Sequence, residues 1–228
     1  MEFERRKEAS KISELLKLHN AVLSIVADLV ECRDEITGGH VARTQKYLYC
    51  LVEKLLEQGG VYAEEISSWD LDFVLPSAQL HDVGKICIGD GILNKPGKLT
   101  EAEYEIIKTH VALGVDAITR MEQATGDHSF FRHAKIFAGT HHERWDGKGY
   151  PNGLSGADIP LGGRLLALAD VYDALISIRP YKQALPFREA DAVMLAGSGT
   201  HFDPLLIDVF RAVSQRFADI AANKEQPA

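Results

Sequence analysis

The hydrophobic and polar residues of this chain recur with a helical period almost throughout. The first periodic segment covers about residues 3–35, where apolar residues alternate steps of three and four. These residues are Leu15, Leu18, Val22, Ile25 and Leu29. Such a heptad pattern is typical of a coiled-coil seam, and the charged start of the segment resembles a domain cut from a longer chain. We therefore predict one long helix, and we favour a linker helix that joins an upstream domain and dimerises over an ordinary first helix.

Seven further segments show the same periodicity. They cover about residues 40–58, 68–82, 100–121, 130–142, 164–177, 186–196 and 204–222. Thr100 and Glu103 have the spacing of a capping box, which predicts the start of the third of these helices. The polar, glycine-rich stretches 84–97 and 145–163 have the character of functional loops, and strand-like alternation is nowhere sustained. The pattern predicts an all-α helical bundle.

Length and composition fit one main domain with an appendage. Within the 228 residues we predict a linker or dimerisation helix at 1–29, a main domain at 30–222 and a disordered tail at 223–228. The hydrophobic fraction of 46% and the charged fraction of 25% are ordinary for a globular protein. Three widely spaced cysteines, short apolar runs and a charged N-terminus predict a cytoplasmic protein with reduced thiols and no membrane segment.

The charge balance restricts the class of ligand. A formal net charge of −8 argues against binding to nucleic-acid polymers, which usually depends on a basic surface. It does not argue against a small anionic substrate, because bound metal ions can reverse the sign of the local charge at an acidic site. We therefore look for candidate functional residues among the side chains that can bind metal ions.

A set of histidines and aspartates supplies enough ligands for two metal ions. Its members are His40, His81, Asp82, His110, His141, His142 and Asp170. A single inward-facing histidine is usually a hydrogen-bonded core residue, but here five predicted helices each carry an inward His or Asp. Neighbouring residues on a helix diverge by about 100°, so the pairs 81–82 and 141–142 suit two ions about 3.5–4 Å apart with a bridging carboxylate.

The ligand types and the spacing point to hydrolysis of a phosphate ester. Imidazole with carboxylate favours Fe or Mn, with Zn, Co or Ni as alternatives, over the oxygen-only sites of Mg and Ca. Two such ions can hold a bridging water and direct the resulting hydroxide at a phosphorus atom. We therefore predict a metal-dependent phosphodiesterase.

Two motifs resemble those of a known family. Residues 81–85, His-Asp-Val-Gly-Lys, are similar to the signature of the HD metal-dependent phosphohydrolase superfamily. Residues 141–151, His-His-Glu-Arg-Trp-Asp-Gly-Lys-Gly-Tyr-Pro, resemble the defining stretch of its HD-GYP branch. Further matches at 93–97, 159–161, 169–175 and 179–182 extend the resemblance from about residue 30 to residue 210.

The resemblance implies an HD-domain bundle that acts in second-messenger signalling. It implies hydrolysis of cyclic di-GMP to linear pGpG by a metal-bridging hydroxide, with a further step to GMP left open. The seven ligands fall at the family's metal positions, with Asp82 as the bridging carboxylate, and Lys85 matches the lysine that contacts the scissile phosphate. The positions that match substrate contacts are Lys85, Tyr150, Asp173, Arg179 and Lys182.

One departure and two alternatives qualify this expectation. Some family members have a glutamate four residues before the first histidine that helps to hold a third metal; here that residue is Ile36, which cannot be a ligand, so two metals are expected. A catalytically weak cyclic-dinucleotide receptor that signals through the N-terminal helix is one alternative, although no ligand is missing. A phosphodiesterase for another cyclic dinucleotide, such as cGAMP, is the other.

Overall fold

The computed structural model describes residues 2–33, 39–126, 128–178 and 183–222. Their helices are α1 (Glu2–Glu31), α2 (His40–Gln58), α3 (Val61–Ile66), α4 (Leu71–Ser77), α5 (Asp90–Leu93), α6 (Glu101–Thr125), α7 (His128–Thr140), α8 (Leu161–Ile176), α9 (Phe187–Ala196) and α10 (Pro204–Ala221). Three short 3-10 helices, η1 (Ala78–Leu80), η2 (Val83–Cys87) and η3 (Gly156–Asp158), complete them. Across these described ranges the chain forms isolated β-bridges but no strand, which confirms the predicted all-α class.

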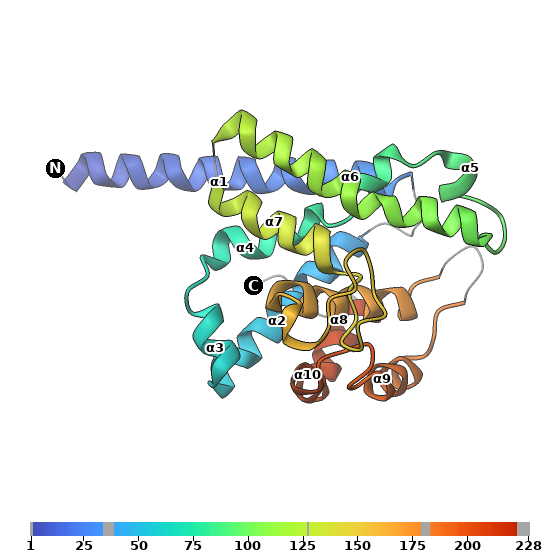
Figure 1. Cartoon of the computed structure of the whole chain (residues 1–228). Coiled ribbons are helices and arrows are strands. Elements are labelled where there is room, and N and C mark those ends of the chain that lie inside the picture. Colours follow the sequence, from blue (N-terminus) through green and yellow to red (C-terminus); the bar gives the residue numbers. More distant parts are fainter. Residues whose placement is uncertain (1, 34–38, 127, 179–182, 223–228) are drawn as a thin grey trace.

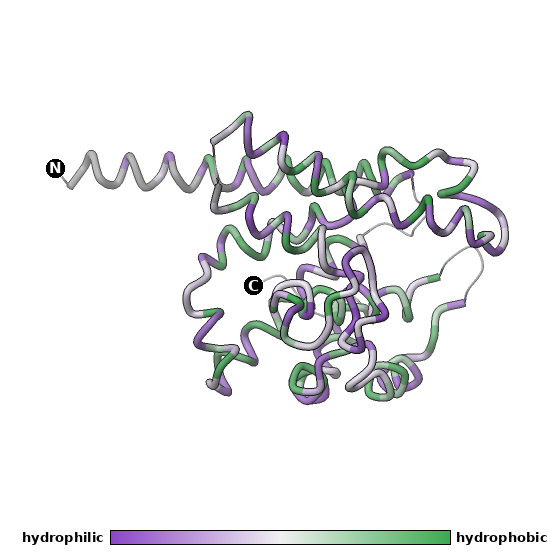
Figure 2. Tube along the Cα trace, in the orientation of Figure 1, coloured by the Kyte–Doolittle hydropathy of each residue, from purple (hydrophilic) through white to green (hydrophobic). Residues whose placement is uncertain are grey.

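The main core lies between α2, α8 and α10. Tyr47, Tyr172 and Phe217, one from each helix, are fully buried, and the Tyr47 and Phe217 rings stack with centroids 4.4 Å apart. Helix α8 is buried along most of its length, as its apolar composition predicts. Figure 2 colours the Cα trace by hydropathy. Burial of such side chains contributes about 1.5–3 kcal/mol each, so this helix is firmly held and can position polar groups.

A second hydrophobic cluster joins α1 to the pair α6 and α7. Leu23 and Val30 of α1 pack in the same cluster as Ile118 of α6 and Phe130 of α7. Figure 1 shows α1 running beside α6 and α7, with its N-terminal end projecting beyond the rest of the molecule. The C-terminal part of α1 therefore belongs to the domain. None of the described helices combines the length and the apolarity needed to cross a membrane.

Two local predictions differ from the structure. The helix predicted over 68–82 is α4 followed by the 3-10 turn η1, and it ends before His81. Pro76 in the last turn of α4 lacks the backbone N–H that would continue the α-helical hydrogen bonds. This accounts for the change from α-helix to 3-10 helix before residue 82. Helix α3 was not predicted, because its six residues are too short for a periodic pattern. The capping box at Thr100 and Glu103 is confirmed, with both of its hydrogen bonds present.

The η2 turn approaches α6 so closely that only glycine fits at residue 84. A Cβ atom there would overlap the backbone carbonyl oxygen of His110 and lie 2.5 Å from the backbone nitrogen of Gly114. We expect Gly84→Ala to lower the free energy of unfolding by about 3 kcal/mol, since backbone atoms cannot yield as a flexible side chain can. Chemical denaturation of both proteins measures this difference.

Gly91→Ala is the matched control, because a Cβ at Gly91 meets nothing within 4 Å. It should change stability by less than about 1 kcal/mol. Equal stability of the two variants would contradict the close approach of η2 to α6.

Candidate metal centre

The side chains that can bind metal form two groups that share one carboxylate. The first group consists of Asp82, His110, His141 and His142, and the second of His40, His81 and Asp82. Within each group the ligand atoms all lie within 4.8 Å of one another. Because Asp82 belongs to both groups, the arrangement suits two neighbouring cations with a shared carboxylate ligand.

Elements far apart in the sequence bring these ligands together. His40 is the first residue of α2, and His110 lies within α6. The adjacent pairs come from short irregular segments, with residues 81–82 between η1 and η2 and residues 141–142 directly after α7. Asp170 of α8 lies beside the second group, with its Oδ1 3.4 Å from His40 Nε2. All seven residues of the expected ligand set therefore converge on one place.

Hydrogen bonds at Nδ1 orient three of the histidines. Nδ1 donates to a backbone carbonyl oxygen in each: to Ala78 from His81 at 2.9 Å, to Ile107 from His110 at 2.6 Å and to Phe137 from His141 at 2.9 Å. With the proton on Nδ1, the Nε2 atom is free to act as a ligand. The backbone thus fixes both the ring orientation and the tautomer that metal binding requires.

The residues fit a cation because the site leaves buried polar atoms without a hydrogen-bond partner. Among the described residues, these atoms include Nε2 of His81, His110 and His141 and Oδ1 of Asp82. Leaving a buried polar group unpaired costs about 1–3 kcal/mol, so four at one place would be strongly unfavourable without a ligand. Imidazole nitrogens from both groups face the Asp82 carboxylate, with His110 and His141 on the side of Oδ1 and His81 on the side of Oδ2. Such donors suit transition-metal ions.

The electrostatics keep Asp82 and His142 in the state that binds metal. Burial acts to raise the pKa of Asp82, but the Lys85 ammonium and His81 outweigh it, so this pKa lies well below its usual range. Burial and the neighbouring His141 lower the pKa of His142 well below its ordinary value. Burial also acts to lower the pKa of His81, but the Asp82 carboxylate raises it to about 9. Metal binding therefore requires His81 to release a proton at neutral pH.

Asp173 binds the Nδ1 side of the His40 ring. Its Oδ2 lies 2.8 Å from His40 Nδ1, and its Oδ1 accepts a 2.7 Å hydrogen bond from Arg43 Nε. Burial acts to raise the pKa of Asp173, but hydrogen bonds from His40 and Arg43 lower it to about 2. The sequence-based expectation placed Asp173 along a substrate pocket, and that role stays a prediction. In this structure its side chain has no exposed surface and contacts His40, an arrangement that suits a residue that positions the histidine.

We expect Asp173→Asn to weaken metal binding by about 10–100-fold at the group that contains His40, as is typical when the partner of a metal-binding histidine is changed. An asparagine is a weaker acceptor for Nδ1 and removes the negative charge that Asp173 presents to the Arg43 guanidinium. Metal titration by calorimetry measures the effect. The exposed Asp208→Asn is the control, and equal affinities in the two variants would contradict the positioning role.

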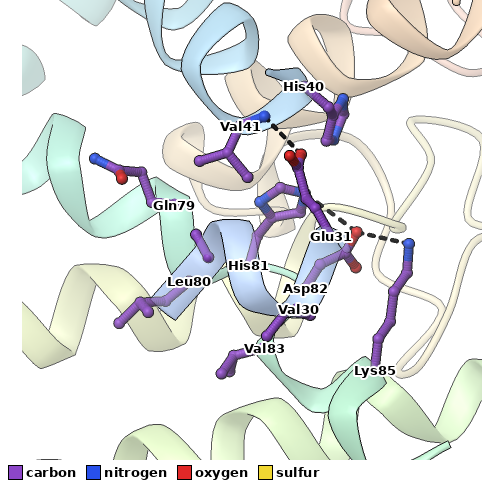
Figure 3. Close-up of a pocket in the computed structure, with 11 residues that line it drawn as sticks. Val30, Glu31, His40, Val41, Gln79, Leu80, His81, Asp82, Val83 and Lys85 are labelled. Carbon is purple, nitrogen blue, oxygen red and sulfur yellow. Dashed lines mark hydrogen bonds and ion pairs between the residues drawn. The ribbon is translucent and has the colours of Figure 1, made fainter. Parts of the chain in front are cut away.

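Sequence reasoning missed Glu31, the last residue of α1. Figure 3 shows its carboxylate pointing toward the start of α2, and Oε1 accepts a 2.7 Å hydrogen bond from the backbone N–H of Val41. Gly39, at the N-cap of α2, has no side chain to do this. Burial raises the pKa of Glu31 although His40 acts to lower it. Glu31 thus holds the turn that carries His40, and no local motif could have identified it.

Glu143, which follows the histidine pair, anchors the next loop. Its side chain is buried and accepts hydrogen bonds from the backbone N–H groups of Asn152 at 2.8 Å and Leu154 at 3.0 Å. These bonds hold the turn that carries Tyr150, whose own backbone N–H donates to the His142 carbonyl oxygen at 3.1 Å. The loop is therefore built against the metal ligands.

Two of the expected substrate residues, Lys85 and Tyr150, contact side chains of the metal-binding groups. Lys85 Nζ lies 2.8 Å from Asp82 Oδ2, and the Tyr150 ring stacks on the His142 ring at 4.6 Å. Tyr104 and Lys108 of α6, which sequence reasoning did not single out, join Tyr150: the Lys108 ammonium lies 5.0 Å and 5.5 Å from the two tyrosine ring centres. Ile36, Arg179 and Lys182 lie outside the described residues.

Comparison with known proteins identifies a family and several relatives. The model of the HD domain family matches residues 24–206. A cyclic di-GMP phosphodiesterase of Vibrio cholerae serotype O1 is 47% identical over 208 residues, which cover 91% of this chain and 42% of that protein. The cyclic di-GMP phosphodiesterase response regulator RpfG of Xanthomonas campestris pv. campestris is 37% identical over 90% of this chain and 54% of its own length.

One further relative has a different substrate in its name. A 3'3'-cGAMP-specific phosphodiesterase 2 of Vibrio cholerae is 40% identical over 198 residues, which cover 87% of this chain and 35% of that protein. The chain thus spans only 35–54% of the length of these three relatives.

Proposed function

This chain belongs to the HD domain family, and we propose that it is a metal-dependent phosphodiesterase that hydrolyses cyclic di-GMP to linear pGpG. The observation that carries the proposal is the pair of ligand groups that share Asp82, with unpaired Nε2 atoms aimed at it. The names of the relatives at 47% and 37% identity support the choice of substrate.

The proposed centre holds two divalent transition-metal ions. His110, His141 and His142 would hold one ion and His40 and His81 the other, with Asp82 between them and Asp170 beside His40. The mixed imidazole and carboxylate donors favour Fe or Mn, with Zn, Co or Ni as further candidates. When bound, such ions lower the pKa of a coordinated water and neutralise the charge of a phosphate group.

The chain's own residues orient the phosphodiester and compensate its charge. Lys85 lies beside the shared carboxylate, so its ammonium can contact a phosphate oxygen at the same edge of the centre. That contact would strengthen as negative charge builds on the phosphate in the transition state. Tyr150, stacked on His142, offers a flat surface for a guanine base, and Arg179 and Lys182 are proposed as further phosphate contacts.

The test is anaerobic turnover of cyclic di-GMP by the chain loaded with Fe(II) or Mn(II), with products separated by chromatography. Linear pGpG should appear and should vanish when a chelator is added. cGAMP is tested in parallel, and faster cleavage of cGAMP would overturn the substrate assignment. Bound metal with tight cyclic dinucleotide binding and no product would overturn the enzyme and establish a receptor.

A further inference from the structure

Helix α1 exposes a continuous apolar stripe. Five large side chains on one face are half exposed or more: Leu15 (64%), Leu18 (61%), Val22 (50%), Ile25 (59%) and Leu29 (61%). They keep the heptad spacing that the sequence predicts. An exposed row of this kind is costly in water and marks an interaction surface, whereas single exposed apolar residues are ordinary.

The stripe points away from the domain. The domain-facing side of α1 carries Leu23, Ala27 and Val30, all buried. Val26, at an e position, packs partly buried beside them. In heptad terms the three buried residues occupy positions b and f, whereas the exposed five alternate between a and d, on the other side of the helix. The packing of α1 on its own domain is therefore complete without the stripe.

Cys32 extends the same register beyond the last exposed leucine. It follows Leu29 by three residues, so it occupies the next d position, and its backbone N–H still donates to the Asp28 carbonyl oxygen at 2.8 Å. The residue is exposed and its thiol is free. The helical geometry of the seam thus continues to the edge of the metal centre.

We propose that the stripe binds the same stripe of a second copy of this chain, as a parallel, in-register two-stranded coiled coil. Leu15, Val22 and Leu29 form its a layers, and Leu18, Ile25 and Cys32 form its d layers. Each residue then meets its own counterpart, which satisfies the symmetry of a dimer. The inference does not depend on the proposed reaction.

The charges that flank the stripe favour this occupant and this orientation. In a parallel pair each g residue faces the e residue five positions later on the partner helix. Asp28 would then face Arg33, whose guanidinium also binds Asp90 of its own chain at 2.7 Å. Glu14 would face His19, whose ring also packs against Phe130 of its own chain, and both contacts across the pair are attractive or neutral. In an antiparallel pair centred on the same stripe, Asp28 would instead face Ala21, and neither contact would form.

A membrane surface is a poorer match for the stripe. Helix α1 contains six acidic and five basic residues. Amphipathic helices that lie on anionic membranes instead carry an excess of Lys and Arg on the polar side. The balanced charge of α1 therefore fits a protein partner that itself carries both signs.

In such a dimer, the interface would lie close in sequence to a residue that holds a metal ligand in each copy. The seam ends at Cys32, directly after Glu31, whose carboxylate binds the first turn of α2 where His40 begins. A change in the packing of the two α1 helices near Cys32 would therefore also move Glu31 and the turn that carries His40.

Light scattering and thiol cross-linking of the full chain test the proposal. The wild type should have the mass of a dimer, and treatment with the thiol oxidant diamide should give a dimer on a non-reducing gel. Cys32→Ser should abolish the cross-link, whereas Cys87→Ser, which removes the other exposed thiol, should retain it. A monomeric wild type, or a dimer that does not cross-link through Cys32, would overturn the parallel arrangement.

Substitutions that place negative charges in the apolar stripe provide a second test of the dimer. Leu18→Glu with Ile25→Glu should convert the dimer to a monomer without loss of fold, because both side chains are already exposed in a single copy. Val193→Glu, on the exposed side of α9, is the matched control and should remain dimeric. A seam variant that stays dimeric with unchanged helicity would place the interface elsewhere and overturn the proposal.

Discussion

Asp82→Asn is expected to abolish metal binding at both ligand groups and to lower turnover of cyclic di-GMP by more than about 10³-fold. Asp82 is the only described residue that belongs to both groups. Its carboxylate oxygens lie 3.2 Å from His110 Nε2 and 3.4 Å from His81 Nε2, so a single side chain faces both histidine sets. An amide of the same shape keeps the packing but loses the charge needed to neutralise two cations.

His40→Ala separates this bridging role from the role of an ordinary ligand. It removes one member of the second group and leaves Asp82, His110, His141 and His142 in place. We expect about one metal ion per chain in His40→Ala and almost none in Asp82→Asn, measured by elemental analysis after dialysis against a weak chelator. Equal stoichiometry in the two variants would contradict a shared carboxylate. Unchanged melting temperatures in both would show that the loss is local.

The ligand set could be predicted from the sequence because its members carry strong local signals. Helix α8 illustrates this: its run of apolar residues predicts burial, and two acids in such a run demand partners. The structure confirms that α8 is buried and places both Asp170 and Asp173 beside His40. Adjacent pairs such as 81–82 and 141–142 carry a similar signal, because two such pairs in one chain suggest ligands for more than one ion. The sequence predicts both pairs within helices, and the structure places them just beyond the helix ends.

The supporting residues could not be predicted, because their partners are distant in the chain. Asp173 and Arg43 are separated by 130 positions, and only the packing of α2 against α8 brings them together. The sequence alone assigned Asp173 to the substrate pocket, and its contacts with His40 and Arg43 became visible only through this packing. Glu31 is a similar case, since its role depends on where the chain returns after the segment 34–38.

Lys85→Met is expected to keep both metals and lower turnover by about 10²-fold or more, the usual cost of removing one donor that stabilises transition-state charge. The Lys85 ammonium lies 2.8 Å from Asp82 Oδ2, which makes it an electrostatic competitor of any cation bound there. Removing that charge should leave metal affinity equal or higher. A fall in rate that is independent of metal content would therefore assign Lys85 to the phosphate.

Lys54→Met is the matched control for this variant, because Lys54 pairs only weakly with Glu57 on the surface of α2. It should match the wild type in rate and in metal content. The decisive readout is the rate of a single turnover at saturating metal and saturating cyclic di-GMP, which removes differences in binding. If Lys85→Met loses metal in proportion to its loss of rate, the lysine stabilises the Asp82 carboxylate for metal binding and does not act on the substrate. If it retains metal and rate together, the phosphate must be neutralised by other groups.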